Sequence, residues 1–218
     1  HRLGGYFLWG TPATMNIEHY HEFREYEEKG LKKQASKSLR AFISSFKSDE
    51  EINEWVWEQL PTMETNRHSR IRHEIFHELV YPILKSGYEN NDFSSTLWLG
   101  KLAQNIYQAQ QLHEELDWVT ELSLYNKSHE LDPSNDEARL LLLKAIVAWL
   151  EYSEHEWPSG ILYGNDGATI EQCDEISTEV QRVLKLDKEH SYSEFIKQYV
   201  KKLSAYRARL NKQRQGTQ

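Results

Sequence analysis

The run from Leu131 to Arg139 constrains the fold of this chain more than any other stretch. Pro133 cannot continue a preceding helix, because its ring removes a hydrogen-bond donor and clashes with the turn before it. Ser134 and Glu137 have the spacing of a capping box, which predicts that a second helix begins at once. Two helices joined by so short a turn pack antiparallel, so the run predicts a helical hairpin.

Apolar and aromatic residues recur at helical spacing along the rest of the chain, with clear stops between them. Gly30, Pro61 and Pro82 are expected to end or kink helices, and no strand is expected because alternation never persists over a strand's length. We therefore predict an all-α fold of about nine helices, either an irregular solenoid of antiparallel hairpins or a compact bundle. The expected helices span 17–29, 31–46, 48–60, 67–85, 97–107, 118–131, 134–150, 169–186 and 195–210.

The length suits one domain or a tightly fused pair, and we predict a single helical domain over residues 15–210. Residues 1–14 are expected to be a leader or N-terminal extension, and residues 211–218 a basic C-terminal tail. The single cysteine, Cys173, excludes an internal disulfide framework and favours a reducing, cytoplasmic location. No apolar run approaches the roughly 20 residues of a membrane helix, and no cofactor is expected.

The formal net charge of -8 argues against nucleic-acid binding, which needs a basic surface. The charge is also unevenly distributed, because acidic residues dominate positions 113–175 whereas the end of the chain is basic. One interpretation is solvated helix faces, and the other is an acidic patch that attracts a protein with a basic surface. The acidic residues are Glu114, Glu115, Asp117, Glu121, Glu130, Asp132, Asp136, Glu137, Glu151, Glu154, Glu156, Asp166, Glu171, Asp174 and Glu175, and the basic ones are Lys201, Lys202, Arg207, Arg209, Lys212 and Arg214.

The segment 152–164 has the most unusual local composition, and long loops between helices often bind partners. Trp157 and Tyr163 offer aromatic anchors beside acidic residues, which suits recognition of an arginine- or lysine-bearing surface. The alternative is a structural loop in which Trp157, Ile161 and Leu162 fill the core. The candidate partner-binding residues are Glu151, Glu154, Glu156, Trp157, Tyr163, Asp166, Glu171 and Asp174.

His73-Glu74-Ile75-Phe76-His77 matches HExxH, in which two histidines share a zinc ion and the glutamate activates its water. Candidates for a third ligand are Glu89, His113, Glu114 and Glu115. The preferred interpretation is an amphipathic helix with Ile75, Phe76, Leu79 and Val80 in the core. We therefore expect a chain without a metal or catalytic site. The alternative is a zinc hydrolase with Glu74 as the base and with His73 and His77 as ligands.

The Leu131-Asp132-Pro133 turn resembles the end of a tetratricopeptide repeat, where leucine-aspartate-proline closes the second helix. Tyr125 and Ser128 stand where that repeat has an aromatic and a small residue, whereas Glu121 stands where it has alanine. The segment 184–188 is a fainter version of the turn without the proline. The resemblance covers one hairpin and implies a repeat-like scaffold or co-chaperone with a concave groove.

The compact, acidic, helical character with one thiol also resembles bacterial immunity proteins. That resemblance implies a protein that binds a cognate toxin and blocks it by steric and electrostatic contact. Carboxylates of the 113–175 region would pair with basic toxin residues, and an aromatic side chain of the 157–163 loop would anchor the interface. The expected function is thus protein binding, with toxin inhibition as its most specific form.

Overall fold

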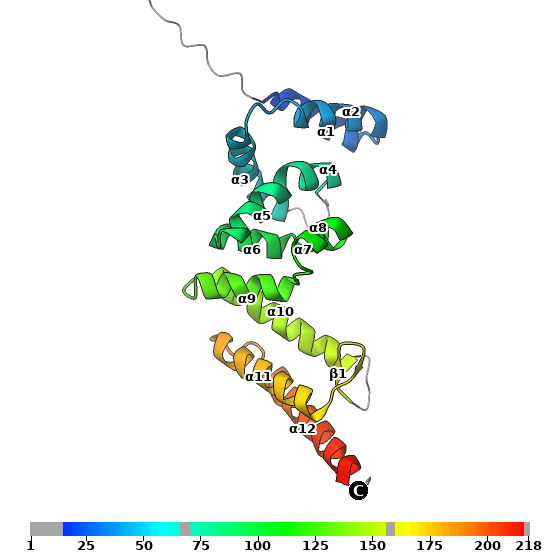
Figure 1. Ribbon diagram of the computed structural model, residues 1–218, viewed down its shortest axis with the longest axis vertical. Helices are drawn as coiled ribbons and strands as arrows, with labels where there is room; N and C mark the ends of the chain where they lie inside the picture. The colour runs from blue at the N-terminus through cyan, green and yellow to red at the C-terminus, as the bar shows by residue number, and fades with distance from the viewer. Residues whose placement is uncertain (1–14, 66–70, 156–159, 216–218) are drawn as a thin grey trace, which may run out of the picture. The chain divides into compact units, whose positions relative to one another are not determined.

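The computed structural model describes residues 15–65, 71–155 and 160–215, and these residues confirm the all-α fold (Figure 1). The chain divides into two compact units, His1–Ser86 and Gly87–Gln218, and the boundary falls within the region 15–210 assigned to one domain. Residues 1–14, assigned to a leader, lie outside the described residues.

The first unit is built from helices packed around aromatic side chains. The turn after its first helix closes as predicted at Gly30, whose φ of 70° is left-handed. Gly30 N–H donates to Glu27 O (3.0 Å) and Leu31 N–H to Tyr26 O (2.8 Å), the two bonds of a Schellman motif. The elements are α1 (Ile17–Glu28), α2 (Lys32–Ile43), α3 (Asp49–Thr65), α4 (His73–Ile75), the π-helical turn η1 (Phe76–Val80) and the start of α5 (Tyr81–Glu89).

The expectation that Pro61 ends a helix was wrong. Pro61 lies inside α3, which continues to Thr65, because the buried side chains of Trp55 and Leu60 hold the helix against its neighbours. Pro82 lies in α5, which follows η1 without a gap, so the helical run from His73 does not end at this proline. The turn before it is π-helical, and this wider turn accommodates the chain at the proline.

The second unit contains two consecutive antiparallel helical pairs, α9 with α10 and α11 with α12, and α10 also packs on α11 (Figure 1). Its core includes Ile146, Leu150, Ile176 and Tyr199, all essentially inaccessible to solvent. Burial raises the pKa of Tyr199 to about 12. The elements are α6 (Phe93–Lys101), α7 (Ala103–Tyr107), α8 (Gln110–Glu115), α9 (Glu121–Leu131), α10 (Asp136–His155), β1 (Leu162–Tyr163), β2 (Asp166–Gly167), α11 (Ile170–Leu186) and α12 (Ser193–Gln215).

Several helix boundaries in this unit differ from the prediction. The helix expected over 97–107 is broken between α6 and α7 at Leu102. Trp118 precedes α9 in a turn with a left-handed backbone, instead of starting the helix. Helix α12 continues through the first five residues of the expected tail, to Gln215.

A short β-hairpin also occurs where no strand was expected. Leu162 pairs with Gly167 and Tyr163 with Asp166, and Gly164 turns the chain with a φ of 64°. Strands of two residues are too short for alternation to reveal them. Ile161 and Leu162 are buried, as the core-filling interpretation of this loop predicted, whereas Trp157 lies outside the described residues.

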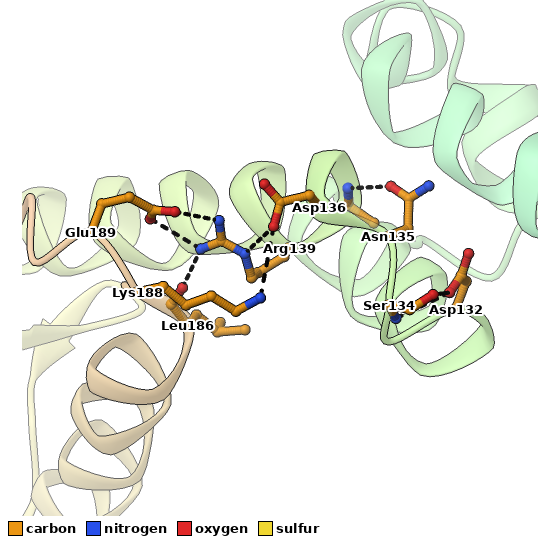
Figure 2. A network of polar contacts seen from close by, with 9 residues as sticks. Asp132, Ser134, Asn135, Asp136, Arg139, Leu186, Lys188 and Glu189 are labelled. Carbon is orange, nitrogen blue, oxygen red and sulfur yellow. Dashed lines mark hydrogen bonds and ion pairs between the residues drawn. The ribbon is translucent and has the colours of Figure 1, made fainter.

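The predicted hairpin around Pro133 is confirmed as α9–α10, but its cap is a different residue. Ser134 does not cap α10, because its backbone N–H and its hydroxyl both donate to Asp132 Oδ1 (3.0 and 2.6 Å). The capping acceptor is Asn135, whose Oδ1 receives the N–H of Ala138 at 3.0 Å (Figure 2). Ser134 therefore lies in an Asx turn formed by Asp132, and its N–H and hydroxyl groups are already hydrogen-bonded before α10 begins.

Asn135→Ala is expected to lower the free energy of unfolding by about 1 kcal/mol, because the Ala138 N–H loses its capping acceptor. Urea denaturation followed by circular dichroism measures this change. Ser134→Ala is the matched control and should have the smaller effect, because its backbone bond to Asp132 remains. A larger effect at Ser134 than at Asn135 would contradict the assignment of the cap.

Arg139 of α10 is 3% exposed and connects the start of this helix to the end of α11 (Figure 2). Arg139 Nε donates to Asp136 (2.8 Å), and its terminal nitrogens donate to Glu189 (2.8 and 3.2 Å) and to the Leu186 carbonyl. These hydrogen bonds raise the pKa of Arg139 above its ordinary value. One guanidinium therefore joins the start of α10 to the loop between α11 and α12.

None of the helices within the described ranges is both long enough and apolar enough to cross a bilayer. This finding agrees with the sequence analysis, which found no apolar run of that length.

Candidate functional site

The acidic residues predicted to bind a partner lie next to the basic residues of α12, which the sequence places far from them. Lys202 Nζ lies 2.9 Å from Glu154, and Arg207 lies 2.7 Å from Asp174. Arg214 lies 4.0 Å from Glu171. These three carboxylates are therefore balanced within the chain, although exposed ion pairs of this kind contribute little stability.

The other predicted residues are distributed differently. Glu151 and Asp166 are exposed, on α10 and β2. Glu156 and Trp157 lie outside the described residues. Tyr163 lines a pocket, and this pocket is our candidate site.

The pocket lies inside the second unit and has a volume of about 560 Å³. Volumes in this range are typical of sites that bind small molecules or a few side chains. Three helices and the tip of the β-hairpin form its walls. The lining residues are Leu122 of α9, Trp149 of α10, Tyr163 and Gly164 of the hairpin, and Glu175, Thr178 and Glu179 of α11.

Two aromatic rings dominate one side of the pocket. The ring centroids of Trp149 and Tyr163 are 6.0 Å apart at an interplanar angle of 87°, an edge-to-face pair that fixes both orientations. The Tyr163 hydroxyl donates a hydrogen bond to Glu175, and this bond raises the pKa of Tyr163. The phenol therefore stays protonated and holds the Glu175 carboxylate beside its ring.

The two carboxylates of the lining differ in their surroundings. Both oxygens of Glu179 accept hydrogen bonds at 2.9 Å from Arg182, which also donates to Asn126. Within the described ranges, Glu175 is bonded to the neutral Tyr163 hydroxyl and has no cationic partner. The Glu179–Arg182 pair is neutral as a whole, so the pocket has one uncompensated negative charge.

Sequence reasoning missed Trp149, Glu179 and Leu122 as site residues. Trp149 lies in the most apolar predicted helix and reads as core, and the pocket joins segments separated by up to 57 positions, from Leu122 to Glu179. Glu175 was included among the acidic residues of 113–175 but was not singled out. The one available signal was the unusual loop composition that identified Tyr163.

The HExxH segment does not lie on one regular α-helix, because the π-helical turn begins at Phe76, between its two histidines. The rings of His73 and His77 are 5.4 Å apart between centroids. Glu74 accepts a hydrogen bond from Arg72 at 3.4 Å. Ile75, Phe76, Leu79 and Val80 are buried, as the core interpretation predicted.

Across the described residues, no group of three or more His, Cys, Asp or Glu side chains has an arrangement that could hold a metal ion. The proposed third ligands, Glu89, His113, Glu114 and Glu115, belong to the second unit, whereas His73 and His77 belong to the first. Cys173 is buried, and burial raises the pKa of its thiol, which lowers its reactivity.

No protein-family model matches this chain, and neither a curated protein nor a solved structure is similar to it.

Proposed function

We propose that the second unit is a protein-binding module whose pocket between α9, α10 and α11 receives a segment of a partner with a basic surface. The observation that carries the proposal is the pairing of two fixed aromatic rings with a carboxylate that has no cationic partner within the described ranges. Aromatic anchors in pockets dominate the energy of protein interfaces, and an uncompensated carboxylate selects the charge of the partner.

The helix arrangement favours a scaffold as the form of this function. Two consecutive antiparallel hairpins provide the walls of the pocket, and binding sites between packed helices are common in helical folds. Toxin inhibition is the narrower form of the same proposal and needs a toxin segment with the same chemistry. The buried single thiol agrees with a cytoplasmic location, which is part of the proposal.

Selection from a phage-displayed library of random linear peptides tests the proposal. Peptides selected on the wild-type chain should bind at least tenfold more weakly to Thr178→Trp, because the new indole fills the pocket that Thr178 lines. Fluorescence polarisation with the selected peptides, labelled, measures the affinities.

Gln181→Trp is the matched control, since it adds the same side chain at an exposed position of α11 that does not line the pocket. It should keep the wild-type affinity. Failure to select any peptide, or equal binding to wild type and to Thr178→Trp, would overturn the proposed function.

A further inference from the structure

We infer that the group bound in this pocket is the guanidinium of an arginine side chain from the partner. This inference rests on the proposed function and specifies the chemistry of its ligand. It follows from the charge of the lining, from the positions of the aromatic rings and from the hydrogen bond that joins one ring to Glu175.

The charge of the pocket selects a single cation. Glu175 contributes one negative charge, while Glu179 is neutralised through two hydrogen bonds from Arg182. Glu175 is exposed, so it repels a dianionic ligand and gains no charge pairing from a neutral one. A group with one positive charge balances the lining.

The rings favour a planar cation over a compact one. A guanidinium stacks on an aromatic face and donates from its edge to a carboxylate at the same time, because its donors lie in the plane of the group. The Tyr163 hydroxyl is bonded to Glu175, so an aromatic ring and a carboxylate lie side by side in this pocket. An ammonium group is a strongly hydrated point charge and gains less from the ring.

The rest of the pocket accommodates the neighbours of the arginine. Leu122 offers apolar contact at the start of α9, and Gly164 adds no side chain to the lining. A short peptide with an apolar residue on each side of arginine therefore fits the lining better than free arginine. A single anchored residue of this kind is expected to bind with a Kd on the order of 1 mM.

Four peptides test the inference, each with the sequence acetyl-Gly-Leu-X-Leu-Gly-amide, where X is arginine, lysine, citrulline or glutamate. Citrulline has nearly the shape of arginine without its charge. Each peptide is titrated to 10 mM (about ten times the expected Kd) into the full chain labelled with ¹⁵N at tryptophan. The indole N–H signal of Trp149 is followed and is assigned through Trp149→Phe.

The arginine peptide should move the Trp149 signal and should bind at least tenfold more tightly than the citrulline and glutamate peptides, with lysine between them. Glu175→Gln should remove the preference for arginine over citrulline, because the carboxylate that pairs with the guanidinium is lost. Glu171→Gln changes an exposed carboxylate of the same helix that lies near Arg214 and outside the pocket, and should keep the preference.

The Trp118 signal provides an internal control for unspecific stacking, because this indole is 55% exposed, follows Asp117 in the sequence and does not line the pocket. The inference is overturned if the affinities measured at Trp118 and Trp149 are equal, or if the arginine and citrulline peptides bind equally. It is also overturned if no peptide moves the Trp149 signal, or if Glu175→Gln keeps the preference for arginine over citrulline. If phage-selected peptides depend on the pocket but contain no arginine, the inference fails while the proposed function stands. If the selected peptides ignore the pocket, the proposed function itself fails.

Discussion

Gly100→Val is expected to lower the free energy of unfolding of the second unit by about 3 kcal/mol, the upper end of the range for overpacking. A Cβ atom at Gly100 would lie 2.6 Å from Cε1 and 2.8 Å from Cδ1 of Tyr125. The Tyr125 side chain is 3% exposed, so its ring has no free space to enter. Helices α6 and α9 pack against each other through this contact and would have to separate.

Urea unfolding followed by circular dichroism measures the loss. Ser94→Ala, at an exposed position of α6, is the control and should change stability by no more than about 0.5 kcal/mol. Tyr125→Leu removes the ring, so Gly100→Val should be less damaging in a Tyr125→Leu background than in the wild type. Additive effects of the two substitutions would contradict direct contact between the two side chains.

Arg139→Met should lower the melting temperature by about 5–10 °C for a unit of this size. Methionine fills a similar space but donates no hydrogen bond, so the buried Leu186 carbonyl loses its side-chain donor. Asp136 and Glu189 are more than half exposed and regain water, which limits the loss. Differential scanning calorimetry measures the change.

Arg139→Lys keeps the charge without the planar fork and should fall between the wild type and Arg139→Met. If the lysine variant were as stable as the wild type, the directed hydrogen bonds of the guanidinium would contribute nothing. If the methionine variant were equally stable, the network in Figure 2 would have no role in holding the two segments together.

The effect of Arg139 should also depend on pH. Its hydrogen bonds lower the pKa values of Asp136 and Glu189 below their ordinary values near 4. A carboxyl group whose pKa is lower in the folded chain adds stability above the ordinary value, and this addition is lost as the pH falls through the folded value. The difference in melting temperature between the wild type and Arg139→Met should therefore be largest near pH 7 and should narrow below about pH 4.

Local sequence signals were reliable where neighbouring residues alone decide the backbone. Gly30 ends α1 because a left-handed residue is needed there, and Thr169 with Gln172 forms a capping box at the predicted start of α11. The turn at Pro133 was also correctly placed, although the acceptor that caps α10 is one residue later than expected. In each case the partners lie within a few positions of one another.

Signals failed where packing outweighed a local preference. Pro61 was expected to end a helix, yet buried neighbours carry α3 past it. The acidic stretch of 113–175 and the basic stretch after residue 200 were treated as separate surfaces. Their ion pairs join residues 33 to 48 positions apart, from Asp174–Arg207 to Glu154–Lys202, and no local pattern predicts such pairs.

The order of most of the helices was determined by the sequence alone, because helical periodicity, caps and turns are properties of short segments. The π-helical turn η1, the break at Leu102 and the β-hairpin were not predicted. Only the tertiary structure decided which carboxylate has no cationic side chain as a partner. Whether a charge is neutralised depends on distances between side chains from different helices, and those distances exist only after α9, α10, α11 and α12 have packed together. Tyr163 was visible in the sequence, but its place beside Trp149 and Glu175 was not.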